Sequence, residues 1–229
     1  MRTQPSKRVD AIIPVNVVKL AKARLSPVLK PDERAHLTLA MLNDVLGAVR
    51  GVRRIGRVTV VSADQNVRKI ARSYISSFIW EGERRGLNKG VRLAILDSEE
   101  KGASAVVIIH ADIPFANSRD LSRFLAKCEE YSVGLVPSRD GYGTNVLFLK
   151  PPGIIKPVFG RHSFQKHQSM CKRRNLKHEV FHSRNLGFDI DEPEDLKRLL
   201  RCRLRGETGR FLRDESRKHS VRSVSESRG

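Results

Sequence analysis

The ten residues from Val106 to Phe115 constrain the fold of this chain more than any other stretch. Four β-branched apolar residues, 106–109, follow one another without interruption, which is typical of a strand buried on both faces of a sheet. Pro114 cannot donate a hydrogen bond to a strand ladder, so the strand must end close to it. We therefore expect Asp112 at the carboxyl end of a central strand, the edge where open α/β sheets bind ligands. A carboxylate there either holds a divalent cation beside phosphates or caps the next turn.

Short apolar segments alternate with helix-forming segments through the rest of the chain. We expect strands near 9–18, 57–62, 78–80, 106–109, 134–137, 145–149 and 179–181, and helices near 31–49, 64–74, 86–96, 118–130, 164–174 and 189–203. The helix at 31–49 has the clearest signals, with proline first, acids in its first turn and apolar residues at helical spacing. This alternation predicts an α/β fold with a mostly parallel central sheet and helices on both faces, in one domain over residues 1–205.

The charge of the chain is strongly positive, +19 overall. Residues 201–229 contain nine Lys or Arg and four Asp or Glu, a net +5, so the remainder still carries +14. Because few apolar residues follow Gly206, we expect 206–229 to be a basic, disordered tail or an appended arm. Such basicity permits polyanionic partners, from nucleotides to nucleic acid, and weak nucleic-acid binding by the tail stays open. Dispersed charge that only keeps the protein soluble is the alternative.

Composition also restricts the compartment. No apolar run reaches the roughly 20 residues that a membrane span needs, and residues 1–10 lack the apolar core of a secretory signal. The three cysteines, Cys128, Cys171 and Cys202, show neither metal-ligand spacing nor a disulfide framework. We therefore expect a cytoplasmic protein that makes no use of a membrane, and a homodimer is compatible with this composition.

Three basic residues, Lys19, Lys22 and Arg24, lie close together after the first strand. Lys and Arg side chains bind phosphates, so this loop is a candidate to lie along the phosphates of a nucleotide at the carboxyl edge of the sheet. The alternative is a solvated basic loop in a basic protein.

A second group of carboxylates lies in the acidic segment 189–196. Acids at a helix start are stabilised by the helix dipole, which accounts for those at 192–195. Asp189 and Asp191 instead alternate with an isoleucine in an extended segment. Since Mg²⁺ prefers one or two carboxylates completed by phosphate oxygens and water, they are candidates to share Mg²⁺ with Asp112.

Two glycine-containing turns, 141–145 and 159–164, each carry a hydroxyl side chain, Thr144 and Ser163. A glycine-rich turn with a hydroxyl, or a glycine before a helix start, can cradle a small anion. Ordinary strand connections are the alternative for both. The histidines at 162 and 167 are off helical register, so we assign no metal pair and expect surface or loop histidines.

Together these motifs resemble the CofC family, the 2-phospho-L-lactate guanylyltransferases of deazaflavin coenzyme F-420 biosynthesis. The resemblance covers residues 9–200 and is carried by Ile13-Pro14-Val15 and by segments 21–29, 31–34, 86–88, 111–114, 143–145, 159–164 and 189–196. It implies a Rossmann-like nucleotidyltransferase fold related to GT-A domains. It also implies guanylyl transfer from GTP to 2-phospho-L-lactate or phosphoenolpyruvate, with release of pyrophosphate.

The resemblance further implies a role for each candidate site residue. Mg²⁺ would be held by Asp112 and Asp191, and the phosphate and carboxylate of the acceptor would be bound by Thr144, Gly160 and Ser163. The GTP phosphates would lie along Lys19, Lys22 and Arg24, and Lys22 and Arg24 would act in catalysis with Asp112. The guanosine would lie near Asn88. The chain departs from the family pattern at two positions. Asn16 replaces a usual Lys, which leaves Lys19 or Lys22 to supply the charge, and Ser138 replaces a usual Asp.

A phosphate acceptor is already a nucleophile, so no Ser-His-Asp or Cys-His set is required, and alignment with charge neutralisation would suffice. The acceptors 2-phospholactate, phosphoenolpyruvate and 3-phosphoglycerate all carry a carboxylate next to a phosphorylated carbon, and the sequence does not choose among them.

Two other functions stay open. One is a different sugar nucleotidyltransferase or a glycosyltransferase of the same fold. Against it, residues 15–24 contain no glycine, and 110–112 read His-Ala-Asp in place of Asp-x-Asp. The other is a nucleic-acid-binding protein, although the aromatic share of 6% is low for a single-strand binder.

Overall fold

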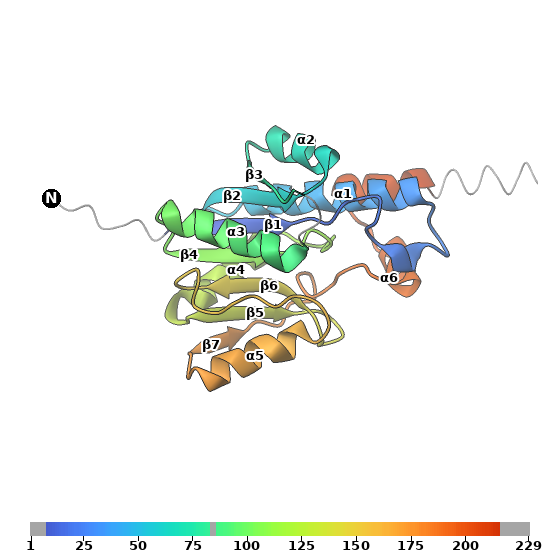
Figure 1. The fold of residues 1–229 in the computed structure, drawn as a ribbon. Helices are drawn as coiled ribbons and strands as arrows, with labels where there is room; N and C mark the ends of the chain where they lie inside the picture. The colour runs from blue at the N-terminus through green and yellow to red at the C-terminus, as the bar shows by residue number, and fades with distance from the viewer. Residues whose placement is uncertain (1–7, 83–85, 216–229) are drawn as a thin grey trace, which may run out of the picture.

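The computed structural model describes residues 8–82 and 86–215, which form a seven-stranded sheet covered by helices (Figure 1). The predicted central strand is β4 (Ala105–Ile109), whose five residues are all buried. It pairs in parallel with β1 (Val9–Pro14), and the strand order across the sheet is β3-β2-β1-β4-β6-β5-β7. The predicted α/β architecture with a mostly parallel sheet is confirmed.

All the predicted strands and helices are present, with bounds that move by a few residues. The other strands are β2 (Ile55–Ser62), β3 (Ser77–Trp80), β5 (Val133–Pro137), β6 (Thr144–Leu149) and β7 (His178–Val180). The helices are α1 (Pro31–Arg50), α2 (Gln65–Ser73), α3 (Leu87–Glu100), α4 (Ser118–Lys127), α5 (Ser163–Arg173) and α6 (Pro193–Leu200). Short 3-10 helices lie at Ala23–Leu25 and Cys128–Glu130.

Helix α1 forms where the sequence predicted it because both of its ends are specified locally. Pro31 occupies the first turn, where its missing N–H costs nothing, and the Glu33 carboxylate accepts a hydrogen bond from the Lys30 backbone N–H at 2.7 Å. At the other end, the Gly51 backbone N–H donates to the carbonyls of Ala48 and Val49.

Strand β6 is the exception to the parallel arrangement, and its direction matters for the site. It runs antiparallel to β4 on one side and to β5 on the other. It therefore begins at the edge where the parallel strands end. The ladder continues past β4, with the His110 N–H donating to the Asn145 carbonyl at 3.0 Å. The first residues of β6, Thr144 and Asn145, are thereby brought next to the residues that follow β4.

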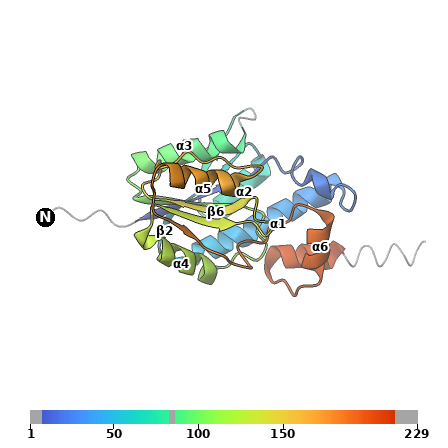
Figure 2. The ribbon, with the colours of Figure 1, turned by 90° about the horizontal axis from the view of Figure 1, so that it is seen from below.

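Helices cover both faces of the sheet (Figure 2). Helices α3 and α5 cover one face, around a core that includes Val91, Ala94 and Cys171. Helices α1, α2 and α4 pack on the other, where Leu46, Val67, Phe124 and other apolar side chains form the largest buried cluster. Because both faces are covered, the strands are apolar throughout, as the run at 106–109 indicated.

Residues 206–215 are helical and pack beside α1 (Figure 1), so the prediction of a disordered tail is wrong for them. The Asp44 carboxylate of α1 accepts hydrogen bonds from the backbone N–H groups of Glu207 at 2.8 Å and Thr208 at 2.9 Å, which anchors the start of this helix. Leu212 joins a buried cluster with residues of α1 and α6. The rest of the predicted tail, 216–229, lies outside the described residues.

Among residues 8–82 and 86–215, no helix has the length and apolar character that crossing a membrane requires.

Candidate active site

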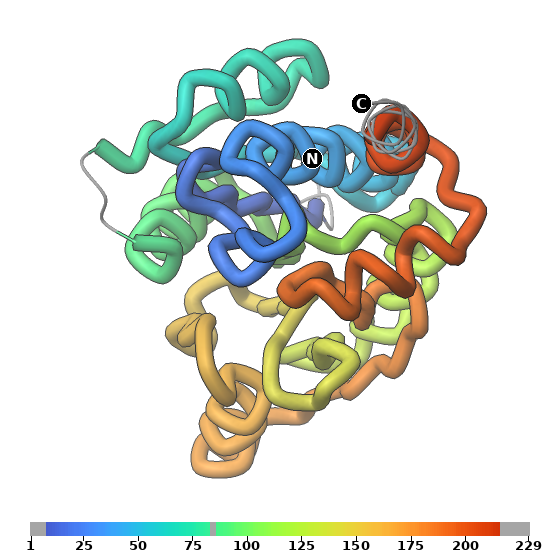
Figure 3. Tube along the Cα trace, turned by 90° about the vertical axis from the view of Figure 1, so that its right-hand side faces the viewer, coloured from blue at the N-terminus to red at the C-terminus, as the bar shows by residue number. Residues whose placement is uncertain are grey.

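The loops that follow β1, β4 and β5 gather at the carboxyl edge of the sheet, together with those that lead into α5 and α6 (Figure 3). Two cavities open there. One, of about 700 Å³, is lined by residues of the glycine-rich loop 138–145, of 160–163 and of the acidic segment. The other, of about 370 Å³, is lined by residues of the loop after β1 and of the start of α3. Both cavities reach His110, Asp112, Gly160 and Asp191, so they meet at these residues.

The centre of the site is an ammonium group between two carboxylates. Lys22 Nζ lies 2.6 Å from Asp112 Oδ2 and 2.9 Å from Asp191 Oδ1. The lysine adopts a left-handed backbone conformation (φ 56°) in the loop after β1. The Ile190 N–H donates to the Asp112 carbonyl at 3.3 Å, which holds the acidic segment against the end of β4. The structure therefore brings Asp112 and Asp191 to the same ammonium group at this edge of the sheet.

The charges of these groups stabilise one another. Burial alone would lower the pKa of Lys22, whose side chain is 7% exposed, but the two carboxylates outweigh burial and hold the pKa above its usual range. Burial likewise opposes ionisation of Asp112, yet the Lys22 ammonium holds the pKa of Asp112 below its usual value. At neutral pH the site thus contains a buried cation bound by two anions.

Asp189 is the carboxylate that this cation does not reach. Burial, followed by the charges of Asp112 and Asp191, raises the pKa of Asp189 to about 7. Asn145 Nδ2 donates to Asp189 Oδ1 at 3.3 Å and to the Leu186 carbonyl at 3.1 Å. Three carboxylates therefore lie at this edge of the sheet, and Lys22 pairs with two of them.

The protein offers a metal ion two carboxylates at this edge, those of Asp112 and Asp191. Within 8–82 and 86–215, no group of three or more His, Cys, Asp or Glu side chains has an arrangement that could hold a metal ion. Asp112 Oδ1, however, is buried and has no hydrogen-bond partner in that part of the chain. Its other oxygen and Asp191 already bind a cation, Lys22 Nζ. The two carboxylates therefore fit a cation, while the ion itself stays a prediction.

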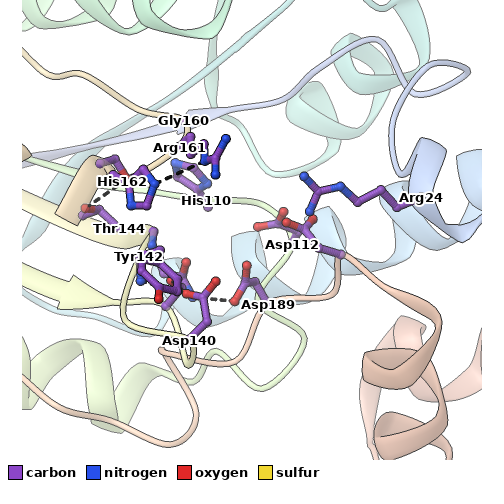
Figure 4. A pocket seen from close by; sticks show the side chains of 15 residues that line it. Arg24, His110, Asp112, Asp140, Tyr142, Thr144, Gly160, Arg161, His162 and Asp189 are labelled. Atoms are coloured by element: carbon purple, nitrogen blue, oxygen red, sulfur yellow. Dashed lines mark hydrogen bonds between the residues drawn. The ribbon is translucent and has the colours of Figure 1, made fainter. Parts of the chain in front are cut away.

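Thr144 lies across the larger cavity from Arg24 (Figure 4), and Ser163, the second predicted hydroxyl, also lines this cavity. Thr144 and Ser163 are both 2% exposed, and Ser163 Oγ lies 3.4 Å from Thr144 Oγ1. Ser163 is the first residue of α5, so the positive end of the helix dipole faces this wall. Gly160 has φ 115°, a conformation that L side chains rarely adopt, and it lines both cavities. The three predicted acceptor residues thus lie together on one wall.

The glycine-rich loop is closed by the serine that departs from the family pattern. Ser138 Oγ accepts from the Gly143 N–H at 2.6 Å and donates to Asp140 Oδ1 at 2.5 Å. Asp140 also accepts from the Tyr142 N–H at 2.9 Å. A Cβ atom at Gly143 would lie 2.7 Å from Ser138 Oγ, so the close approach requires glycine. Ser138 therefore shapes the loop through hydrogen bonds to the backbone of Gly143 and the side chain of Asp140, both of which belong to the same loop.

Of the remaining residues that were predicted to contact the nucleotide, Arg24 and Asn88 each line one of the cavities and Lys19 lines neither. Arg24 lines the larger cavity and is paired with Glu192 Oε1 at 3.7 Å. Asn88 lines the smaller cavity, but its side-chain amide binds the Phe159 backbone, accepting from N–H at 2.7 Å and donating to the carbonyl at 3.0 Å. Lys19 is exposed and is not among the residues that line either cavity.

Several cavity residues were not predicted from the sequence. The larger cavity also contains His110, Asp140, Tyr142, Arg161 and His162. His110 had a usable signal, since it immediately follows the central strand. The expectation of two surface or loop histidines is wrong for His167, which is fully buried in α5.

Comparison with known proteins agrees with this geometry. The family model described as "Guanylyl transferase CofC like" matches residues 9–227. A phosphoenolpyruvate guanylyltransferase of Sphaerobacter thermophilus is 36% identical over 190 residues, covering 82% of this chain and 91% of the relative. A 2-phospho-L-lactate guanylyltransferase of Methanocaldococcus jannaschii is 33% identical over 189 residues, with 82% and 81% covered.

The fold itself is shared more widely. A crystal structure of a candidate nucleotide-diphospho-sugar transferase from Desulfovibrio desulfuricans G20 superimposes with a TM-score of 0.75 at 19% identity, covering 92% of this chain and 96% of that one. This confirms the predicted nucleotidyltransferase fold. Since the family model spans nearly the whole chain and the relatives exceed 30% identity, the chain is a nucleotidyltransferase of the CofC guanylyl transferase family.

Proposed function

We propose that this protein transfers the guanylyl group of GTP to the phosphate of a small phosphorylated carboxylic acid, either 2-phospho-L-lactate or phosphoenolpyruvate. The observation that carries the proposal is the pair of cavities that meet at Asp112, Asp191 and Gly160. The smaller cavity, lined by Lys22 and Asn88, is the candidate nucleotide site. The larger cavity has Arg24, two hydroxyls and a helix start for a second anion. A reaction that joins two phosphates needs this arrangement of two anion sites with one shared centre.

The chemistry requires no proton transfer at the attacking atom. An oxygen of the acceptor phosphate forms a bond to the α-phosphorus of GTP, and the bond from that phosphorus to the bridging oxygen of the β-phosphate breaks. Pyrophosphate leaves with the electron pair. The acceptor oxygen is already deprotonated at neutral pH, so the protein has to align two anions and neutralise their charge.

The residues at the junction are suited to that task. Lys22 and Arg24 supply positive charge beside the α-phosphate, and Lys22 is held in place by Asp112 and Asp191. Thr144, Gly160 and Ser163 hold the acceptor on the opposite wall. Asn88 acts on the nucleotide side by fixing the Phe159 backbone next to Gly160, which lines both cavities.

Asp112 and Asp191 are the residues that would hold Mg²⁺. When bound, the ion would neutralise developing charge on the phosphates, which is the usual service of Mg²⁺ in phosphate chemistry. The buried, unpartnered Asp112 Oδ1 and the ammonium bound to both carboxylates support a cation at this position.

Competition among acceptors tests the proposal. Purified protein is incubated with Mg²⁺, GTP and 2-phospho-L-lactate, phosphoenolpyruvate or 3-phosphoglycerate, first singly and then together, and pyrophosphate is measured. We expect pyrophosphate to form with at least one acceptor and only when GTP is present. Absence of pyrophosphate with all three acceptors would refute the proposal. Omitting the acceptor is the matched control, because simple GTP hydrolysis does not depend on it.

A further inference from the structure

The buried histidine of α5 contacts the acceptor wall from behind. His167 is fully buried, and its Nδ1 lies 3.0 Å from Thr144 Oγ1. Its Nε2 lies 3.0 Å from the backbone nitrogen of Val158, whose N–H points at it. The ring also packs edge-on against Phe159, with centroids 5.5 Å apart. The imidazole therefore has one defined partner on each nitrogen.

The partner on Nε2 determines where the proton of His167 lies. A backbone N–H can only donate, so Nε2 must accept and carries no proton. The proton of the neutral ring is then on Nδ1, which donates to Thr144 Oγ1. A doubly protonated ring would place two N–H groups against each other at Val158. Burial lowers the pKa of His167 to about 4, in agreement with a neutral ring at pH 7.

Counting hydroxyl protons shows what this tautomer does to the site. Thr144 and Ser163 have two hydroxyl protons between them, and their mutual hydrogen bond uses one. Because His167 donates to Thr144, the second proton stays free for the cavity that both residues line. With the opposite tautomer, Thr144 would donate to His167 and Ser163 to Thr144, and neither hydroxyl would have a proton left for a ligand.

We propose that His167 is a positioning residue whose Nδ1–H keeps a hydroxyl proton of the Thr144–Ser163 pair available to an anionic oxygen of the acceptor. This proposal rests on the proposed function, and it adds a statement of which acceptor groups can bind at the wall formed by Thr144 and Ser163. The wall offers a donor, so it accepts a deprotonated phosphate or carboxylate oxygen. A group that can only donate at this point, such as an ammonium, leaves the hydroxyl proton unpaired and binds less well.

Two substitutions at His167 separate positioning from packing. His167→Asn places an amide N–H near the position of Nδ1 and retains the donor to Thr144. His167→Met has comparable bulk and no donor. We expect His167→Met to raise the KM of the acceptor roughly tenfold or more, with the KM of GTP changed less than about twofold, because the Thr144 hydroxyl loses the Nδ1–H donor that orients its proton toward the acceptor. The Asn variant is expected to recover most of the acceptor affinity.

A double-mutant cycle with Thr144→Val provides the matched control. Once the hydroxyl is absent, the donor on His167 has no group to orient. The Thr144→Val, His167→Met protein should therefore be no worse for the acceptor than Thr144→Val alone, because residues acting as a unit are non-additive. Losses that simply add, or equal rises in the KM of GTP and of acceptor, would contradict positioning and indicate a packing role.

A spectroscopic measurement needs neither turnover nor folded variants. Nitrogen NMR of the ¹⁵N-histidine-labelled wild-type protein at pH 7 should show His167 with a proton on Nδ1 and none on Nε2. A proton on Nε2 would overturn the proposal. Calorimetry with phosphoenolpyruvate in the absence of GTP adds a binding readout. If the wild-type protein transfers no guanylyl group, the proposed function fails, while the tautomer and the binding of wild type, Met and Asn variants still decide the role of His167.

Discussion

Lys22 links Asp112 and Asp191 at the centre of the site, although the three residues lie far apart in the chain. Asp112 was predictable because a buried apolar run ends immediately before it. Asp191 followed from its extended, alternating segment. The position of the Lys22 ammonium between them was not predictable, because Lys22 is 90 residues from Asp112 and 169 from Asp191. The left-handed backbone of Lys22 also gives no signal in the sequence. Which of several loop lysines turns inward is decided by tertiary packing.

Asp112 and Asp191 are expected to act as one unit. Asp112→Asn and Asp191→Asn should each lower activity by roughly 100-fold or more, since each removes charge from the shared cation site. The double variant should be little worse than either single one. Because asparagine keeps an oxygen that accepts from Lys22 Nζ, all three proteins should remain folded. Turnover and thermal melting are measured on the same preparations. A single variant that melts normally and keeps near-full activity at saturating Mg²⁺ would remove that residue from the site.

His167 also contributes a pH dependence to stability. Burial, with smaller contributions from His110 and Lys166, depresses its pKa to about 4, against an ordinary value of 6.5. Between these values the unfolded chain binds a proton that the folded protein does not, so stability falls as pH falls from 6.5 to about 4. The His167→Met variant lacks this group. Its deficit in unfolding free energy should therefore be largest at pH 7 and shrink toward pH 4, by an amount on the order of 3 kcal/mol. Urea unfolding of both proteins at several pH values measures it, and a deficit independent of pH would contradict burial of a neutral ring.

At the scale of elements, local signals predicted helices and strands well, whereas contacts between elements escaped them. The start of α5 illustrates this. Its buried residues are Ser163, His167 and Cys171, spaced four apart, so they share one helix face. That spacing is present in the sequence, yet the expectation was a surface or loop histidine at position 167. What could not be seen was that β6 runs antiparallel and brings Thr144 against this face.

The helix at 206–215 was missed for a similar reason. Its segment is rich in charge and has few apolar residues, so composition favoured disorder. Its order comes from outside: the Asp44 carboxylate binds its first backbone N–H groups, and Leu212 completes a cluster that includes Leu37 and Met41. Neither partner is near it in sequence.

This anchoring can be tested by mutation and truncation. Asp44→Ala should lower the free energy of unfolding by about 0.5–2 kcal/mol, the usual cost of losing a capping carboxylate. Deleting 206–229 should destabilise the protein more, because it also uncovers the apolar cluster around Leu37 and Met41. Chemical denaturation measures both. Deletion of 216–229 alone is the matched control, and equal effects of the two deletions would contradict the packing role of 206–215.

At the scale of the whole molecule, the topology follows from alternating strands and helices, and it dictates where a site can form. The carboxyl ends of the parallel strands and the amino end of β6 share one edge, and every predicted acceptor or metal residue lies there. The direction of β6 was not predictable, because apolar runs carry no information on orientation. Acceptor choice is likewise undetermined by topology, since it depends on single side chains.

The net charge of +19 leads to a separate expectation about nucleic acid. Binding driven by phosphates must weaken steeply as salt rises. Residues 216–229 contain four Lys or Arg, so deleting them should reduce the slope of log affinity against log salt by about 3 for single-stranded RNA. Filter retention at several salt concentrations checks this with the full chain as control. Retention of RNA that is the same at all salt concentrations, or the same with and without residues 216–229, would argue against the tail as the cause.

Isotope labelling shows whether the acceptor phosphate attacks the α-phosphorus of GTP. The acceptor is prepared with ¹⁸O in its non-bridging phosphate oxygens and incubated with GTP, Mg²⁺ and the protein. Mass spectrometry of the products should find all of the label in the guanylylated acceptor and none in pyrophosphate. Label in pyrophosphate, or release of labelled orthophosphate without a guanylylated product, would contradict the account.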